Sequence, residues 1–278
     1  MTDIVFAAGL GSTGSSALVD LLREFDDFYS PNDEFRLFVD PDGIVNLKNA
    51  FVDNWSIFQT DMALRRFEKL VKQLNRKWIG NYFRLDHRKY FDQYMVERSN
   101  KLINDLTQVK YNGLWYAINN FYYAYLIRTN FIHDSISRSW FNSRPMRIGK
   151  KLTGFEFDAL INEYINDLVS YCLDKNNKSK FCFNENFSAM FPNNINSMVK
   201  GSKIVLVVRD PRDVYADSLR VKWLGMPNKF EDYLEWQRSI YNGWMDIQTS
   251  KEINLNNLLV IKFEDLVGDY ENTKIKVF

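Results

Sequence analysis

Residues 4–25 read IVFAAGLGSTGSSALVDLLREF, and this stretch decides the fold. Its first five residues are apolar and predict a short buried strand. A loop of small residues runs from Gly9 to Ser16. Beyond it, the apolar residues recur at the spacing of one helix face, at Ala17, Leu18, Leu21, Leu22 and Phe25. The sequence therefore predicts a strand, a glycine- and serine-rich loop and a helix in immediate succession.

A loop in this position suits a phosphate group. Backbone N–H groups at the start of a helix have no partner within the helix, and the helix dipole favours negative charge there. Glycines let the backbone approach the anion closely, and the hydroxyls of Thr13, Ser15 and Ser16 can add hydrogen bonds. The alternative interpretation is a plain turn that joins a strand to a helix.

The loop departs from the P-loop of ATPases and kinases at one position. Gly9 and Gly14 have the separation found in the motif G-x-x-x-x-G-K-[ST], but Ser15 stands where that motif has lysine. The lysine reaches the β- and γ-phosphates of a nucleoside triphosphate. Its absence argues against an ordinary ATPase or kinase.

The remaining strands and helices alternate. Strands are predicted over residues 28–30, 181–183, 203–208 and 258–263, and helices over 157–172 and 230–244. The stretch KIVLVV at 203–208 is typical of a parallel strand buried on both faces. We therefore expect an α/β, P-loop-like three-layer fold, with a central parallel sheet flanked by helices. Residues from about 56 to 145 are expected to form a large, mostly helical insertion within a single domain spanning 1–278.

Composition argues against several classes of function. The 36 Lys and Arg residues nearly balance the 35 Asp and Glu residues, so there is no electrostatic signature of nucleic-acid binding. The two cysteines, Cys172 and Cys182, and the two histidines, His87 and His133, suggest no metal site. We see no signal peptide and no stretch that could span a bilayer. We therefore expect a cytoplasmic protein without an integral membrane segment.

A second anion site is predicted at residues 208–214, which read VRDPRDV. Arg209 follows the strand 203–208, and open parallel sheets bind ligands at the carboxyl ends of their strands. A guanidinium group there can bind a phosphate through two hydrogen bonds. Pro211 is suited to the first turn of a helix with Asp210 as its N-cap. The alternative is that Asp210 and Asp213 only pair with arginines.

These segments resemble those of the sulfotransferase superfamily, and the chain would be a divergent, bacterial-type member. Residues 11–16 are similar to the family's 5′-phosphosulfate loop, residues 208–214 to its 3′-phosphate segment, and FEDL at 263–266 to a late strand motif. The resemblance covers residues 4–25 and about 180–270. It implies an enzyme that uses 3′-phosphoadenosine 5′-phosphosulfate (PAPS) without a metal. The sulfuryl group would pass to a hydroxyl or amine of a small-molecule or carbohydrate acceptor.

The resemblance also implies site residues, with departures from the family pattern. The phosphosulfate would be bound by Gly11, Ser12, Thr13, Gly14, Ser15 and Ser16. Arg209 would hold the 3′-phosphate together with Ser218. The family usually has a basic residue where Ser12 stands, and its serine contact to the 3′-phosphate falls on Asp217, one residue before Ser218.

For the chemistry, some family members use a glutamate after the second strand as the base, and Glu34 fits that place. The alternative for Glu34 is an acid in a surface turn. Arg36 could replace the missing basic residue, with Lys150 or Lys151 as weaker candidates. Asn184 and Glu185 follow the predicted third strand and could line the site.

Aromatic residues in the insertion could stack on an acceptor or belong to the core; they are Trp115, Tyr116, Phe121, Tyr122 and Tyr123. Two alternative functions stay open at this point. One is a P-loop kinase or other nucleotide phosphotransferase, and the other is a nucleotide-binding module without catalysis.

Overall fold

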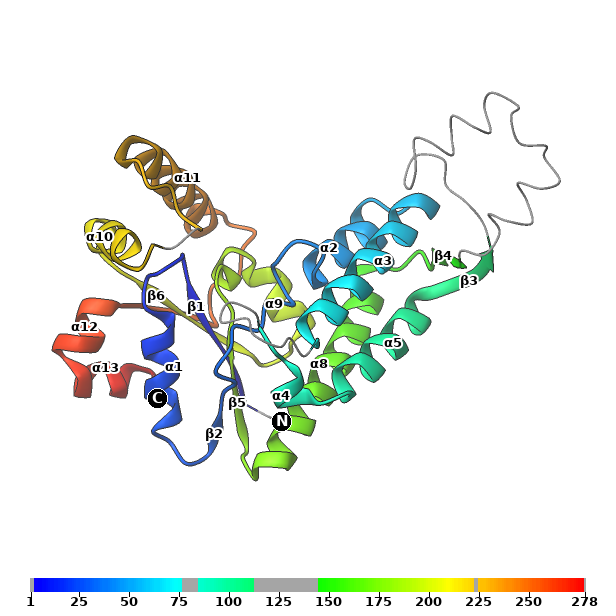
Figure 1. Ribbon diagram of the computed structural model, residues 1–278, viewed down its shortest axis with the longest axis horizontal. Coiled ribbons are helices and arrows are strands. Elements are labelled where there is room, and N and C mark those ends of the chain that lie inside the picture. Colours follow the sequence, from blue (N-terminus) through cyan, green and yellow to red (C-terminus); the bar gives the residue numbers. More distant parts are fainter. Residues whose placement is uncertain (1–2, 77–84, 113–144, 223–224, 278) are drawn as a thin grey trace.

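The computed structural model describes residues 3–76, 85–112, 145–222 and 225–277. Five strands form one parallel sheet in the order β2-β5-β1-β6-β7. Their bounds are β1 Asp3–Gly9, β2 Phe28–Tyr29, β5 Lys180–Asn184, β6 Lys203–Val208 and β7 Leu258–Lys262. Helices flank this sheet (Figure 1). The predicted α/β fold with a central parallel sheet is confirmed.

Alternating side chains of β1 supply two cores. Ile4 and Phe6 belong to a large cluster on one face, whereas Val5 and Ala7 belong to a smaller cluster on the other. The large cluster involves α8 (Gly154–Asn176) and α9 (Pro192–Met198), and the smaller one involves α1 (Ser15–Arg23), α12 (Phe263–Gly268) and α13 (Tyr270–Val277). Burial on both faces explains why β1 and β6 read as continuous apolar runs.

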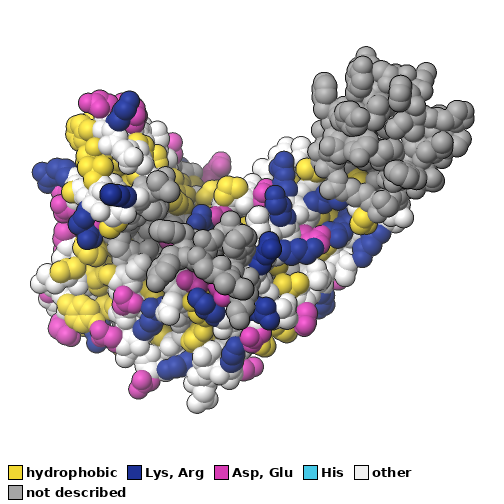
Figure 2. Space-filling model, viewed as in Figure 1, with side chains coloured by type: hydrophobic (Ala, Val, Ile, Leu, Met, Phe, Trp, Pro, Cys, Tyr) yellow, Lys and Arg dark blue, Asp and Glu magenta, His cyan; other side chains and the backbone are white. Residues whose placement is uncertain are grey.

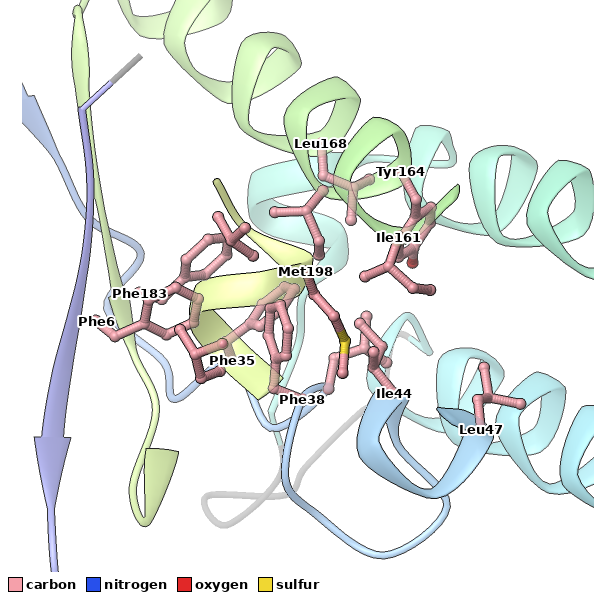
Figure 3. Close-up of a cluster of buried hydrophobic side chains, with 14 of the residues drawn as sticks. Phe6, Phe35, Phe38, Ile44, Leu47, Ile161, Tyr164, Leu168, Phe183 and Met198 are labelled. Carbon is pink, nitrogen blue, oxygen red and sulfur yellow. The ribbon is translucent and has the colours of Figure 1, made fainter. Parts of the chain in front are cut away.

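The large core anchors the segment that follows β2. The rings of Phe35 and Phe183 lie 4.4 Å apart between centroids, and Phe183 stacks on Phe6 at 5.1 Å. Figure 3 shows these rings and Phe38 against β1 and β5, with Met198 and the helices beyond them. Since these four phenylalanines are at most 2% exposed, the backbone around residues 35–38 is held firmly against the sheet.

A helical body extends from this core (Figure 1). It contains α2 (Ile44–Lys48), a π-helix (Asn49–Asp53), α3 (Ile57–Leu74), α4 (Arg88–Phe91) and α5 (Tyr94–Leu106), and α8 packs on α5. Two antiparallel strands, β3 (Thr107–Asn112) and β4 (Pro145–Gly149), were not predicted, because their residues are polar and give no clear alternation. Among the described helices, none combines the length and the apolar composition that a membrane span requires.

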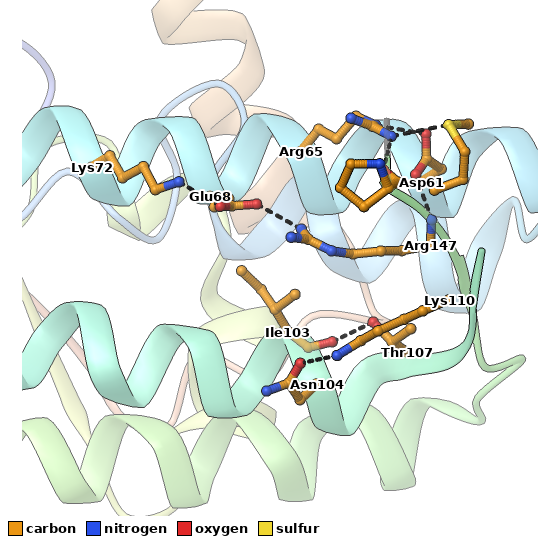
Figure 4. Close-up of polar contacts among 11 residues, drawn as sticks. Asp61, Arg65, Glu68, Lys72, Ile103, Asn104, Thr107, Lys110 and Arg147 are labelled. Carbon is orange, nitrogen blue, oxygen red and sulfur yellow. Dashed lines mark hydrogen bonds and ion pairs between the residues drawn. The ribbon is translucent and has the colours of Figure 1, made fainter. Parts of the chain in front are cut away.

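Polar contacts attach β4 to α3 (Figure 4). The buried carboxylate of Asp61 accepts a hydrogen bond from the backbone N–H of Arg147 at 2.8 Å and one from Arg65 Nε at 2.8 Å. The guanidinium of Arg147 in turn donates to Glu68 at 2.6 Å. Asp61 thus supplies a partner to a backbone group that the strand alone leaves unpaired.

Candidate functional site

The loop after β1 and the residues after β6 lie side by side, because the two strands are neighbours in the sheet. From β1 the chain continues to β2 on one side, whereas from β6 it continues through α10 (Pro211–Val221) and α11 (Phe230–Thr249) to β7 on the other. Open α/β sheets bind ligands in the crevice where connections from adjacent strands diverge in this way.

The loop from Gly9 to Gly14 has an unusual backbone. Gly11, Ser12 and Gly14 have φ angles of 85°, 48° and 98°, in the left-handed region. The hydroxyl of Thr13 accepts a hydrogen bond from Leu10 N at 3.1 Å and so closes the loop on itself. Within the described structure, α1 has no side-chain N-cap and no acid in its first turn. The positive end of this helix is therefore open to an anion.

Phe263 connects the loop to the second segment. A Cβ atom built on Gly14 would lie 2.2 Å from Phe263 Cδ2, so only glycine fits against the ring. The guanidinium carbon of Arg209 lies 4.6 Å from the centroid of the same ring. The next residue, Glu264, accepts a hydrogen bond from the backbone N–H of Asp210 at 2.9 Å. The three segments singled out in the sequence therefore meet at one place.

The guanidinium group of Arg209 is only loosely paired among the described residues. The side chain of Arg209 is 19% exposed, and its buried Nε has no hydrogen-bond partner among the described residues. Its Nη1 lies 3.6 Å from Asp217 Oδ2, a loose ion pair. A hydrogen bond from Arg220 is the main reason that the pKa of Asp217 lies below its usual value, and Arg209 adds to it. Asp217 thus faces the arginine with a negative charge.

Ser218 is less available. It is 3% exposed, and its hydroxyl donates to the carbonyl of Tyr215 at 2.8 Å within α10. The predicted cap of this helix is confirmed, since Asp210 Oδ1 accepts from the backbone N–H of Arg212 at 2.8 Å and Pro211 opens the first turn.

A cavity of about 660 Å³ lies between the loop, the end of β6, α10 and α11. Leu10 and Thr13 border it on the loop side, and Arg209 borders it at the strand end. The rest of its wall is mostly aromatic and aliphatic, including Tyr215, Tyr233, Leu234, Tyr241, Trp244 and Met245. Figure 2 shows Lys and Arg interspersed among Asp and Glu over the visible face of the molecule. A size and lining of this kind are typical of small-molecule sites.

The side chain of Asn186 lies between Glu34 and the start of α1. The carboxylate of Glu34 accepts a hydrogen bond from Asn186 Nδ2, and Asn186 Oδ1 lies 3.5 Å from the hydroxyl of Ser15, the first residue of α1. Burial raises the pKa of Glu34, while the charge of Arg36 and the hydrogen bond from Asn186 oppose the rise. Arg36 is itself exposed, has a φ of 53° and donates to Asp40 at 2.6 Å.

Two residues that the sequence did not single out, His87 and Tyr90, contact the segment that carries Glu34. His87 is 1% exposed, and its Nε2 lies 2.9 Å from the backbone carbonyl of Glu34. Burial lowers the pKa of His87, so the ring is neutral and donates this bond from Nε2. Tyr90 accepts from Asn32 N and donates to Asp33, both at 3.1 Å. A lone histidine in a helical stretch carries no signal of such a contact.

Asn184 and Glu185 differ in their surroundings. Asn184 Oδ1 accepts from the Ser15 hydroxyl at 3.4 Å, beside the loop. Glu185 is 1% exposed beneath the segment 36–40, and its Oε1 accepts from Val39 N at 3.2 Å. Burial raises the pKa of Glu185 to about 8, so this acid is largely protonated near neutral pH.

Other candidate residues lie elsewhere or outside the described structure. Lys150 and Lys151 are exposed and follow β4, where Lys150 N donates to the carbonyl of Leu106 at the end of α5. The aromatic residues from Trp115 to Tyr123 lie outside the described residues. In the described part of the chain, no three His, Cys, Asp or Glu residues are grouped as a metal ion would require.

Comparisons with known proteins give remote likenesses, all of them among solved structures. No protein-family model matches the sequence, and a search of curated proteins found no match. Among solved structures, a sulfotransferase domain from the curacin biosynthetic pathway aligns with 100% of this chain and 72% of its own. The two share 14% of residues with a TM-score of 0.42. At this identity and TM-score, the likeness says nothing of this chain's function.

Proposed function

We propose that this chain is a sulfotransferase that uses PAPS as donor. The observation that carries the proposal is that one cavity touches both the loop, at Thr13, and the second segment, at Arg209. A nucleotide with phosphate groups at both its 5′ and 3′ positions needs two such contacts on either side of its nucleoside. An ordinary ATP site also needs the lysine that Ser15 replaces.

The residues divide into two anion sites and a space between them. The loop residues 11–16 and the open start of α1 would hold the 5′-phosphosulfate, with the hydroxyls of Ser15 and Ser16 as further donors. Arg209, which borders the cavity, would hold the 3′-phosphate through its guanidinium group. The adenosine would lie in the cavity of about 660 Å³, against the aromatic side chains of α10 and α11. Ser218 would contribute only if its hydroxyl left the carbonyl of Tyr215.

Glu34 is the base in this proposal. PAPS would supply an activated sulfuryl group, which passes to the acceptor oxygen as the bond from sulfur to the 5′-phosphate oxygen breaks. The acceptor hydroxyl must lose its proton in this step, and Glu34 lies beside the loop where the sulfuryl group would sit. Its raised pKa makes it a stronger base than an exposed glutamate. Arg36, on the same segment, would balance charge if it left Asp40.

Binding measurements separate the proposal from the other nucleotide functions. In calorimetric titrations, 3′,5′-ADP should bind more tightly than ADP or ATP. Arg209→Ala should weaken 3′,5′-ADP by at least about tenfold, because hydrogen bonds to a charged group are lost, and should change ADP much less. Lys203→Ala is the matched control, since it removes a positive charge at the opposite end of β6. Binding of ATP without 3′,5′-ADP would indicate a kinase-type enzyme instead.

Turnover measurements test the role of Glu34. The protein is incubated with PAPS and a panel of phenols, sugars and amines, and release of 3′,5′-ADP is followed. Glu34→Gln should abolish release while leaving 3′,5′-ADP affinity within about twofold of the wild type. Undiminished turnover in this variant would remove Glu34 from the mechanism. Tight binding of 3′,5′-ADP without turnover on any acceptor would favour a binding module.

A further inference from the structure

Three consecutive residues, Asn184, Glu185 and Asn186, lie between the loop of residues 9–16 and the segment that carries Glu34. Their position follows from the strand order. Because β5 lies between β2 and β1, the carboxyl end of β5 lies between the segment that follows β2 and the loop that follows β1. The backbone contributes on both sides. Phe35 N donates to the carbonyl of Asn184 at 2.8 Å, and Glu185 N donates to the carbonyl of Ala7 at 3.1 Å.

The side chain of Asn186 makes contacts in both directions. Its Nδ2 donates to Glu34 Oε1, and its Oδ1 lies 3.5 Å from the hydroxyl of Ser15. A Cβ atom built on Gly9 would lie 2.7 Å from the same Oδ1, so the amide is pressed against the loop backbone. The single proton of the Ser15 hydroxyl is shared between Asn186 Oδ1 and Asn184 Oδ1. An aspartate at position 186 could accept from Ser15 but could not donate to Glu34, and a leucine could do neither.

The position of Asn186 is fixed by its neighbours. The backbone N–H of Phe187 donates to the carbonyl of Gly9 at 2.8 Å, directly beside the loop. Phe187 has a φ of 60°, a left-handed conformation that turns the chain from β5 into the 3₁₀ helix Ser188–Met190. Because backbone hydrogen bonds hold the residues on both sides of Asn186, its side chain can point in few other directions.

We propose that Asn186 is a positioning residue, which holds the carboxylate of Glu34 toward the nucleotide loop and in its ionised form. This inference rests on the proposed function, in which Glu34 is the base. Asn186 acts through Glu34 and is not itself placed against the reacting atoms. A donor to a carboxylate stabilises the charged form, and burial alone would leave Glu34 protonated to a higher pH.

Other charged groups near Glu34 also influence its pKa. On its own segment these are Arg36 and Asp40, and Arg36 favours the ionised form whereas Asp40 opposes it. From the helical body, the neutral His87 donates to the backbone carbonyl of Glu34. After β5, the buried acid Glu185 lies under the same segment. The loop itself, residues 9–16, carries no titratable side chain.

The test measures the pKa of Glu34 directly, and so does not depend on turnover. Side-chain carboxyl carbons are labelled with ¹³C in the full chain, and the Glu34 signal is assigned by its loss in Glu34→Gln. Asn186→Leu should raise the pKa of Glu34 by about one unit, since a hydrogen bond to a charged group is lost. Asn193→Leu is the matched control, because Asn193 is an exposed amide on α9 that bonds only backbone groups near residues 252–254.

Turnover supplies the second measurement. In Asn186→Leu the acidic limb of kcat/KM against pH should move up by the same amount as the pKa, kcat should fall, and KM for PAPS should change less than kcat. An unchanged pKa in Asn186→Leu, or an equal rise in Asn193→Leu, overturns the inference whether or not the enzyme turns over. A raised pKa in a protein that transfers no sulfuryl group overturns the proposed function instead, and leaves the tie between Asn186 and Glu34 in place.

Discussion

Asp217 should weaken the binding of a 3′-phosphate, and Asp217→Asn should strengthen it. The carboxylate lies 3.6 Å from Arg209 Nη1, so a phosphate bound to the same guanidinium would sit near this negative charge. The substitution keeps the size of the side chain and removes the charge. Both the attraction to Arg209 and the repulsion of the ligand disappear, and both changes favour the ligand.

The magnitude follows from Coulomb's law. Two unit charges roughly 6 Å apart interact by about 0.7 kcal/mol in water and about 2.8 kcal/mol at an effective dielectric constant of about 20. The Asp217 side chain is 30% exposed, so a value near the lower end applies. About 1 kcal/mol corresponds to roughly fivefold in affinity.

The assay is calorimetric titration with 3′,5′-ADP and with ADP, which lacks the 3′-phosphate. Asp217→Asn should tighten 3′,5′-ADP about fivefold and leave ADP nearly unchanged, and the gain should shrink in high salt. Asp213→Asn is the control, since it makes the same charge change one turn earlier on the exposed side of α10. Equal gains for both ligands, or equal gains in both variants, would refute the placement of the 3′-phosphate at Arg209.

Three further predictions concern the loop, the buried acid and the helical body. Gly14→Ala should lower nucleotide affinity and thermal stability, because its Cβ would overlap Phe263 at a φ of 98°, whereas Gly154→Ala should be tolerated since no atom lies within 4 Å. Glu185→Gln should gain stability relative to the wild type as pH rises from about 4.5 to about 8, because a raised pKa gives stability at low pH that ionisation removes; melting temperatures at pH 5 and pH 8 measure this. Asp61→Ala should reduce the free energy of unfolding in urea by about 1–3 kcal/mol, because the backbone N–H of β4 loses its partner, and should leave 3′,5′-ADP affinity unchanged.

The sheet could be predicted from the sequence because its signals are local. The runs at 4–8 and 204–208 are continuous and apolar, which is what burial on both faces requires. The bounds of one helix could not be predicted from the spacing of its apolar residues alone. The predicted helix 157–172 extends from Gly154 to Asn176, since Thr153 and Glu156 form a capping box that lengthens its first turn.

The candidate site could be predicted only in part, for a physical reason. The loop and Arg209 are each marked by a strand end, which a sequence shows directly. The contacts of Asn186 with Glu34 and of His87 with the Glu34 carbonyl join residues far apart in the chain. Such contacts depend on which strands are neighbours, and the order β2-β5-β1 cannot be read from periodicity. The exposed strand β3 gave no periodic signal either.

Phe263 makes the order of synthesis matter for the site. Its ring lies against Gly14 and beneath the guanidinium of Arg209. A chain growing on the ribosome displays the loop long before the ring that supports both anion contacts, because Phe263 follows Gly14 at a large separation in the sequence. Contacts between such distant residues are slow to form. A nucleotide in the cell would therefore stabilise the finished chain and give little help to the nascent one.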